Sequence, residues 1–109
     1  MYKIALKLGG VEKEFTKDYI NVEDNLLAVE HQVRQTALIQ DVKKNRDPKE
    51  HRKLNESYLE MFVNMFGDKF TVADLKQADM SILETLNNLY LAALGVKEES
   101  EEEAEKKKQ

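Results

Sequence analysis

Few side chains in this sequence have the type and spacing that catalysis or metal binding requires. The chain has no cysteine, so it offers neither a thiolate nucleophile nor a thiolate metal ligand. Its two histidines, His31 and His51, lie twenty residues apart, and no carboxylate pattern beside either one completes a metal site. The sequence has no phosphate-binding loop, nucleophile elbow or zinc motif. It therefore predicts a protein that is not an enzyme and needs no cofactor or metal.

Two tyrosines and two aspartates are the remaining candidates for acid–base chemistry. Tyr58 and Tyr90 carry hydroxyl groups, but no histidine or carboxylate motif flanks either one at a recognisable spacing. Half-buried packing is the more frequent role of such tyrosines. Asp74 and Asp79 are five residues apart, and helix capping is the simpler role for both.

A basic segment at residues 43–53 could bind phosphate groups. It holds six Lys or Arg side chains against two acidic ones, and it raises an alternative function, that of a small nucleic-acid-binding regulator. No aromatic residue is interleaved for base stacking, and such charge runs are mostly solvated surface. The net charge of −4 is also the wrong sign for a nucleic-acid binder, so we expect no nucleic-acid partner.

Methionine and aromatic side chains are the best candidates for holding another protein. They recur at helical spacing from residue 58 to residue 66, and methionine adapts its shape to varied partners. The same spacing is typical of a helix packed into a core, which is the more frequent outcome. The residues to which we assign partner binding are Tyr58, Met61, Phe62, Met65, Phe66, Leu86 and Tyr90.

These side chains must be positioned by the rest of the chain, which begins with a predicted β-hairpin at residues 2–16. Polarity alternates with period two before Gly9-Gly10, and this pair can supply the positive φ angles of a two-residue turn. The resulting register pairs Leu8 with Val11, Lys7 with Glu12, Leu6 with Lys13 and Ile4 with Phe15. A lone hairpin is marginal in water, so its apolar face must lie on helices or on another chain. Its open edge also offers a site for self-association.

Capping signals divide the following residues into predicted helices at 22–43, 48–66, 72–77 and 81–94. The N-terminal signals are Asn21, Asp47 followed by Pro48, Thr71 with Asp74, and Ser81 with Glu84. Gly67 and Gly95 are placed to end the second and last helices. The first helix carries an apolar stripe at helical spacing, widened by Leu38 and Val42, that consists of Val22, Leu26, Val29, Val33 and Ala37.

The composition predicts one mainly α domain at residues 1–96, formed by the hairpin and a small bundle of three to four helices. A chain of 109 residues can bury a single modest core. Residues 97–109 are almost only Glu and Lys, so we expect a disordered charged tail. No apolar run approaches the roughly 20 residues needed to cross a bilayer, and the N-terminus lacks a signal-peptide pattern. A cytoplasmic location without a membrane partner is therefore expected.

One segment resembles a known family, the phage tail assembly chaperones, and most closely those of long-tailed phages of Gram-positive bacteria. The likeness is carried by Met65-Phe66-Gly67-Asp68-Lys69-Phe70-Thr71, then Asp74-Leu75, then Leu83 and Leu86. In that family a helix ends at a Gly-Asp turn, a Phe-Thr pair starts a short helix, and an amphipathic helix follows. The opening hairpin and the long first helix are also similar to family members.

The resemblance implies a non-enzymatic function and a set of partners. Such proteins bind the long, helical tape measure protein while the tail is built, and they help tail-tube subunits to polymerise around it. They act in the host cytoplasm and are typically absent from the finished virion. Many also exist in a longer form made by ribosomal frameshifting. Lys106-Lys107-Lys108 can be encoded by the adenine run that such slippage uses, although a merely solubilising tail explains these residues equally well.

Overall fold

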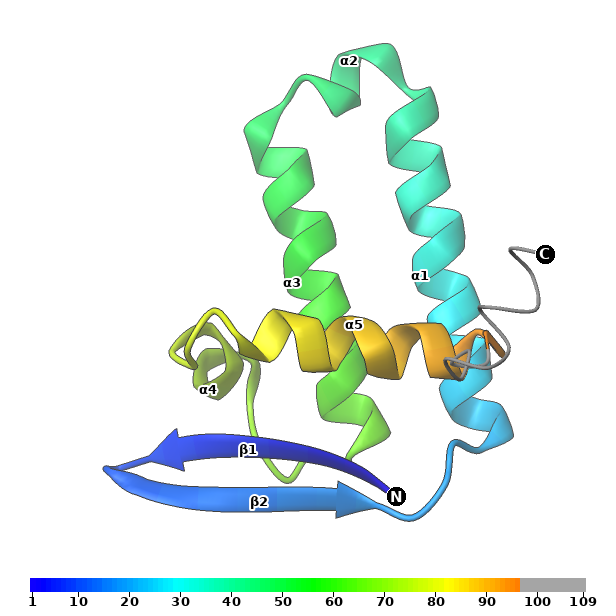
Figure 1. Ribbon diagram of the computed structural model, residues 1–109. Helices are drawn as coiled ribbons and strands as arrows, with labels where there is room; N and C mark the ends of the chain where they lie inside the picture. The colour runs from blue at the N-terminus through cyan, green and yellow to red at the C-terminus, as the bar shows by residue number, and fades with distance from the viewer. Residues whose placement is uncertain (97–109) are drawn as a thin grey trace, which may run out of the picture.

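The computed structural model describes residues 1–96 as a mainly helical domain that begins with an antiparallel β-hairpin (Figure 1). The hairpin consists of β1 (Tyr2–Leu8) and β2 (Val11–Lys17). The helices that follow are α1 (Val22–Gln40), α2 (Val42–Asn45), α3 (Pro48–Met65), α4 (Val72–Lys76) and α5 (Ile82–Ala93). The predicted fold class is therefore confirmed. The predicted charged tail and its three consecutive lysines lie outside the described residues.

The hairpin has the predicted register. Its pairs include Leu8 with Val11, Lys7 with Glu12, Leu6 with Lys13 and Ile4 with Phe15. Gly9 and Gly10 have φ angles of 60° and 81°, as a tight hairpin turn with two left-handed residues requires. Ile4 and Leu6 are buried in the same cluster as the apolar side chains of the helices. The helices therefore supply the burial that an isolated hairpin lacks.

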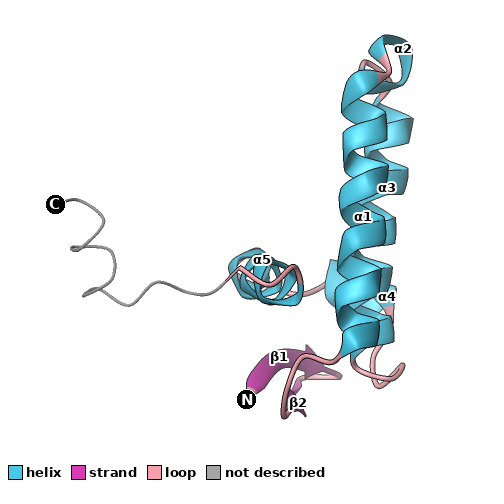
Figure 2. Ribbon diagram, turned by 90° about the vertical axis from the view of Figure 1, so that its right-hand side faces the viewer, coloured by secondary structure: helices cyan, strands magenta, loops and turns pink. Residues whose placement is uncertain are grey.

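The helices form an antiparallel pair with a third helix laid across it. α1 and α3 lie side by side, and α2 joins them at one end (Figures 1 and 2). α5 crosses the pair near its other end, where α4 and the hairpin also lie (Figure 1). The core fills this crossing, and its largest fully buried side chains are Phe62, Ile4, Leu6 and Leu86. The α2 end of the helix pair extends beyond the core.

The predicted helix over 22–43 is interrupted at Asp41. The backbone of Asp41 is extended, and its side chain accepts hydrogen bonds from the N–H groups of Lys43 and Lys44 at 3.1 and 3.0 Å. A short aspartate side chain can compete in this way with continued helical bonding. α1 therefore ends at Gln40, and Asp41 caps the separate short helix α2.

The capping box predicted at Ser81 and Glu84 is wrong. Ser81 has a helical backbone, with φ −59° and ψ −20°, and its side chain makes no capping hydrogen bond. The Asp79 carboxylate instead accepts a hydrogen bond from the Ser81 N–H at 2.9 Å. This bond holds the pKa of Asp79 below its ordinary value. The turn that enters α5 thus starts two residues earlier than the sequence pattern indicated, whereas the box at Thr71 and Asp74 forms as predicted.

Candidate functional site

The two tyrosines that could act as acids or bases belong to a buried aromatic cluster with His31. The His31 ring centroid lies 4.7 Å from that of Tyr58 and 5.3 Å from that of Tyr90. The Tyr58 and Phe62 ring centroids are 4.8 Å apart. α1, α3 and α5 each contribute to this cluster, which therefore joins the three helices at their crossing.

The electrostatics of the aromatic cluster favour uncharged side chains. Burial, with a smaller contribution from Tyr90, raises the pKa of Tyr58 to about 12. Burial also raises the pKa of Tyr90. Burial first, and then the nearby Arg34 guanidinium, lower the pKa of His31 from 6.5. These shifts all favour the neutral form of the ring, which is the form that packs in an apolar environment at the least cost.

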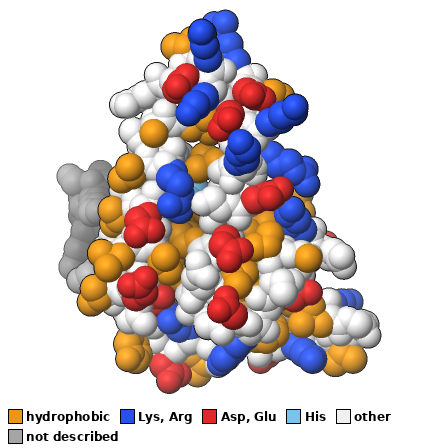
Figure 3. Space-filling model, turned by 180° about the vertical axis from the view of Figure 1, so that it is seen from behind, with side chains coloured by type: hydrophobic (Ala, Val, Ile, Leu, Met, Phe, Trp, Pro, Cys, Tyr) orange, Lys and Arg blue, Asp and Glu red, His pale blue; other side chains and the backbone are white. Residues whose placement is uncertain are grey.

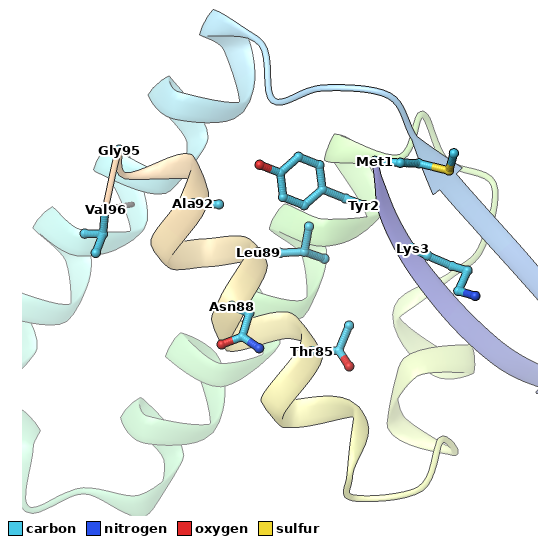
Figure 4. Close-up of a pocket in the computed structure, with 9 residues that line it drawn as sticks. All are labelled: Met1, Tyr2, Lys3, Thr85, Asn88, Leu89, Ala92, Gly95 and Val96. Carbon is cyan, nitrogen blue, oxygen red and sulfur yellow. The ribbon is translucent and has the colours of Figure 1, made fainter. Parts of the chain in front are cut away.

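A cleft of about 630 Å³ lies between the start of β1 and α5 (Figure 4). Tyr2 and Leu89 point toward each other across it, and Thr85 and Asn88 lie on the α5 side (Figure 4). Its lining, within residues 1–96, includes no histidine, cysteine or carboxylate. The cleft can therefore offer apolar contact, hydrogen bonds and the Lys3 ammonium, but no carboxylate or imidazole from residues 1–96 that could act as a base.

Residues 1–96 contain neither a metal-binding cluster of side chains nor a helix that could span a membrane. No three His, Cys, Asp or Glu side chains gather there in a group that could hold a metal ion. Among these residues, no helix combines the length and the apolar character that crossing a bilayer demands.

The seven residues assigned to partner binding lie together, but in the core. Six of them are between 0% and 9% exposed, and Tyr58 is half-buried. Their helical spacing correctly indicated one shared face on α3 and one on α5. A partner could reach these side chains only if the core opened. Their role in partner binding stays a prediction, and the folded domain uses them for its own packing.

The apolar stripe of α1, in contrast, is turned to the outside. Val22, Leu26, Val29 and Val33 are 75%, 49%, 41% and 63% exposed, and we call these four residues the outer stripe. Ala37 is exposed on the same face. Hydrophobic side chains line the side of the molecule on which α1 lies in the view from behind (Figure 3). A surface helix normally turns such a stripe toward the core, so this arrangement is inverted.

Polar contacts explain why α1 faces this way. The Lys17 ammonium lies 3.0 Å from the Asp24 carboxylate, and it also donates a hydrogen bond of 3.0 Å to the Met65 carbonyl. The Asn25 amide donates a hydrogen bond of 2.7 Å to the Ala93 carbonyl. Rotating α1 to bury the outer stripe would break these contacts. It would leave the buried Asp24 carboxylate without its ion-pair partner, which is costly. The polar bonds, together with the burial of Ala28 and His31, therefore hold the outer stripe outward.

The basic segment at 43–53 lies at the α2 end of the helix pair. Blue side chains gather at that end in the space-filling view, with acidic ones close by (Figure 3). Arg52 lies 3.1 Å from Glu56, and Lys53 lies 3.8 Å from Glu50. Part of the positive charge is thus paired within the protein, and this weakens the case for a phosphate-binding surface.

A model of a protein family matches the chain over residues 1–109, and its description is phage tail chaperone protein. No match was found among curated proteins or solved structures. The family match spans the hairpin and all the described helices, so it concerns the domain as a whole.

Proposed function

The chain belongs to the family of phage tail chaperone proteins, and from this premise we propose that it binds the tape measure protein during tail assembly. The family makes the protein a tail assembly chaperone whose partners are tail proteins. In our proposal it holds apolar helical segments of the tape measure protein in solution until tail-tube subunits polymerise around them. It acts without catalysis, in the host cytoplasm, and leaves before the virion is complete.

The observation that carries this proposal is the family match over the whole chain. The outer stripe supports it, because a chaperone needs exposed apolar surface with which to hold apolar segments of another protein. The aromatic cluster has a packing role in this proposal. Its tyrosine and histidine rings contact one another and join α1, α3 and α5.

Co-expression tests the proposal. The tape measure protein of the same phage is produced alone, with the full chain, or with an unrelated small helical protein of similar charge. We expect the full chain, but not the unrelated protein, to raise the soluble fraction of the tape measure protein. The chain and the tape measure protein should also elute as a complex. Unchanged solubility together with the absence of a complex would overturn the proposed function.

A longer frameshifted form is a separate part of the proposal. It concerns Lys106-Lys107-Lys108, whose codons the gene reveals. An unbroken adenine run followed by an open shifted frame should yield peptides that cross the junction, detected by mass spectrometry of infected cells. Mixed lysine codons, or a stop directly downstream in the shifted frames, would remove this part and leave the chaperone function untouched.

Self-association through the hairpin edge also belongs to the proposal, and we expect any such dimer to be weak. The two-stranded sheet leaves one side of each strand unpaired by the other strand. Lys3 and Lys7 are exposed on β1, and charged side chains on an edge strand oppose pairing with a second copy. Sedimentation at increasing concentration measures the strength of this association.

A further inference from the structure

The outer stripe has the spacing of a coiled-coil seam. Its members follow one another at intervals of four, three and four residues, which gives the 3.5-residue period of two helices packed along a shared seam. From Val22 to Val33 the seam is about 16 Å long, or roughly three helical turns. A second α-helix laid along α1 would cover it.

The two sides of this seam differ in charge. Glu23 and Glu30 lie seven residues apart and flank the outer stripe on one side, whereas Asn25 and Gln32 flank it on the other. No ion pair joins Glu23 or Glu30 to another side chain within residues 1–96. The seam therefore has one acidic side and one uncharged side.

A second copy of α1 fits this charge pattern poorly. Antiparallel pairing about the middle of the outer stripe would bring Glu30 beside Glu23 of the second copy, because such pairing places the two acidic sides together. Parallel pairing would set the acidic side against Asn25 and Gln32. The only Lys or Arg of α1 is Arg34, which lines the groove between α1 and α3 instead. Neither arrangement offers a cation to the acidic side.

We propose that the outer stripe binds an amphipathic helix of the tape measure protein that carries Lys or Arg at seven-residue spacing opposite Glu23 and Glu30. This inference rests on the proposed function and adds the surface and the chemistry of its partner. The contacts of Lys17 with Asp24 and of Asn25 with Ala93 hold α1 in its orientation before any partner arrives. The surface is therefore preformed, and this reduces the entropy that binding must overcome.

The first test replaces apolar side chains with a residue that keeps helix propensity. The double variant Leu26→Gln/Val33→Gln should weaken the complex with the tape measure protein by at least about tenfold, as expected for central apolar contacts. The matched control is Met80→Gln/Leu83→Gln, because Leu83 is 50% exposed and Leu26 is 49% exposed. The control variant should bind as the wild type does. Circular dichroism and thermal unfolding establish that both variants are folded.

The second test concerns the acidic side. Glu23→Lys/Glu30→Lys should weaken the complex and reduce its sensitivity to salt, since opposite charges across an interface are screened by added ions. Asn25 contacts Ala93 and is left unchanged. Gln32→Lys, on the uncharged side of the same seam, is the matched control and should have the smaller effect. Equal binding by both variants and the wild type would overturn the charge complementarity.

The outcomes separate this inference from the proposed function. If the wild type and the Leu26→Gln/Val33→Gln variant bind the tape measure protein equally, the surface assignment is overturned while the chaperone function stands. If the wild type itself forms no complex, the proposed function fails. If the double variant instead abolishes a dimer of this chain and leaves the complex intact, a second copy is the occupant and the inference is overturned.

Discussion

α1 and α3 lie side by side and each has an apolar stripe, yet only α3 turns its stripe inward. Met61, Phe62 and Met65 of α3 are buried, whereas the outer stripe of α1 is exposed. The buried face of α1 carries Asp24 and His31 instead. Hydrophobic spacing thus reveals that a helix has an apolar face, and contacts with distant residues decide which way that face points.

The largest loss of stability is expected from substitutions of the side chains that fill the core. Phe62 is fully buried, so Phe62→Ala should lower the free energy of unfolding by about 3–5 kcal/mol through lost burial and the cavity left behind. Leu86→Ala, at another fully buried position, should cost about 2–5 kcal/mol. Urea denaturation measures both. A loss below about 0.5 kcal/mol would mean that the side chain is effectively at the surface.

Loss of the contact between Asp24 of α1 and Lys17 should have the next largest effect on the free energy of unfolding. Asp24→Ala removes a carboxylate that pairs with Lys17 and accepts a hydrogen bond from the N–H of Asn21, the N-cap of α1. We expect the free energy of unfolding to fall by about 2–3 kcal/mol, a figure reduced because the Lys17 side chain is partly exposed. Glu23→Ala is the matched control, since Glu23 is an exposed acidic neighbour in the same helical turn. Equal losses from the two substitutions would show that the buried pair does not hold α1 in place.

A smaller, pH-dependent effect should come from His31 on the buried face of α1. Its pKa in the folded protein is lowered from 6.5 by burial and by Arg34, so the unfolded chain binds the proton more readily. Stability from this group is therefore present above about pH 6.5 and is lost as the pH falls below it.

The pH dependence can be assigned by substitution. His31→Phe should flatten the loss of stability that begins as the pH falls below about 6.5. Glu56 and Asp79, whose pKa values are lowered from 4.5 and 3.8, add their own loss only at lower pH. An identical pH profile in the His31→Phe variant would contradict the role given to His31.

The smallest effect on stability is expected from the outer stripe itself. Val22→Ala and Val33→Ala should each change the free energy of unfolding by no more than about 0.5 kcal/mol, because these side chains are already in water. Met65→Ala on α3 provides the direct contrast, with an expected loss of about 2–5 kcal/mol. Similar losses at Val33 and Met65 would erase the difference between the two helices.

Local signals predicted most of the secondary structure. The hairpin register follows from Gly9-Gly10 and strict alternation, and the helix ends follow from caps that lie within a few residues. The two errors, the uninterrupted helix through Asp41 and the capping box at Ser81, arose because a short aspartate side chain can cap several backbone arrangements. Neither position has a glycine or a proline that would have fixed the boundary. Capping by Asp79, in contrast, is confirmed.

The candidate surface could not be predicted in the same way. The hydrogen bond between Asn25 and Ala93 joins residues 68 positions apart, and no sequence pattern within α1 predicts it. Asp24, Ala28, His31 and Leu38 share one helical face, and this spacing was the available sign of the true buried side. The valine stripe was the stronger apolar signal, so the sequence alone indicated the opposite face.

The extension of α1 and α3 beyond the core has a consequence for motion. Leu38 is the one buried residue between residues 33 and 55, so little apolar burial opposes separation of the two helices there. Local opening of this end should therefore require much less free energy than opening at the α5 crossing. Backbone amides near α2 would exchange with solvent while those around Phe62 remain protected, and the domain would have two levels of stability within one pair of helices.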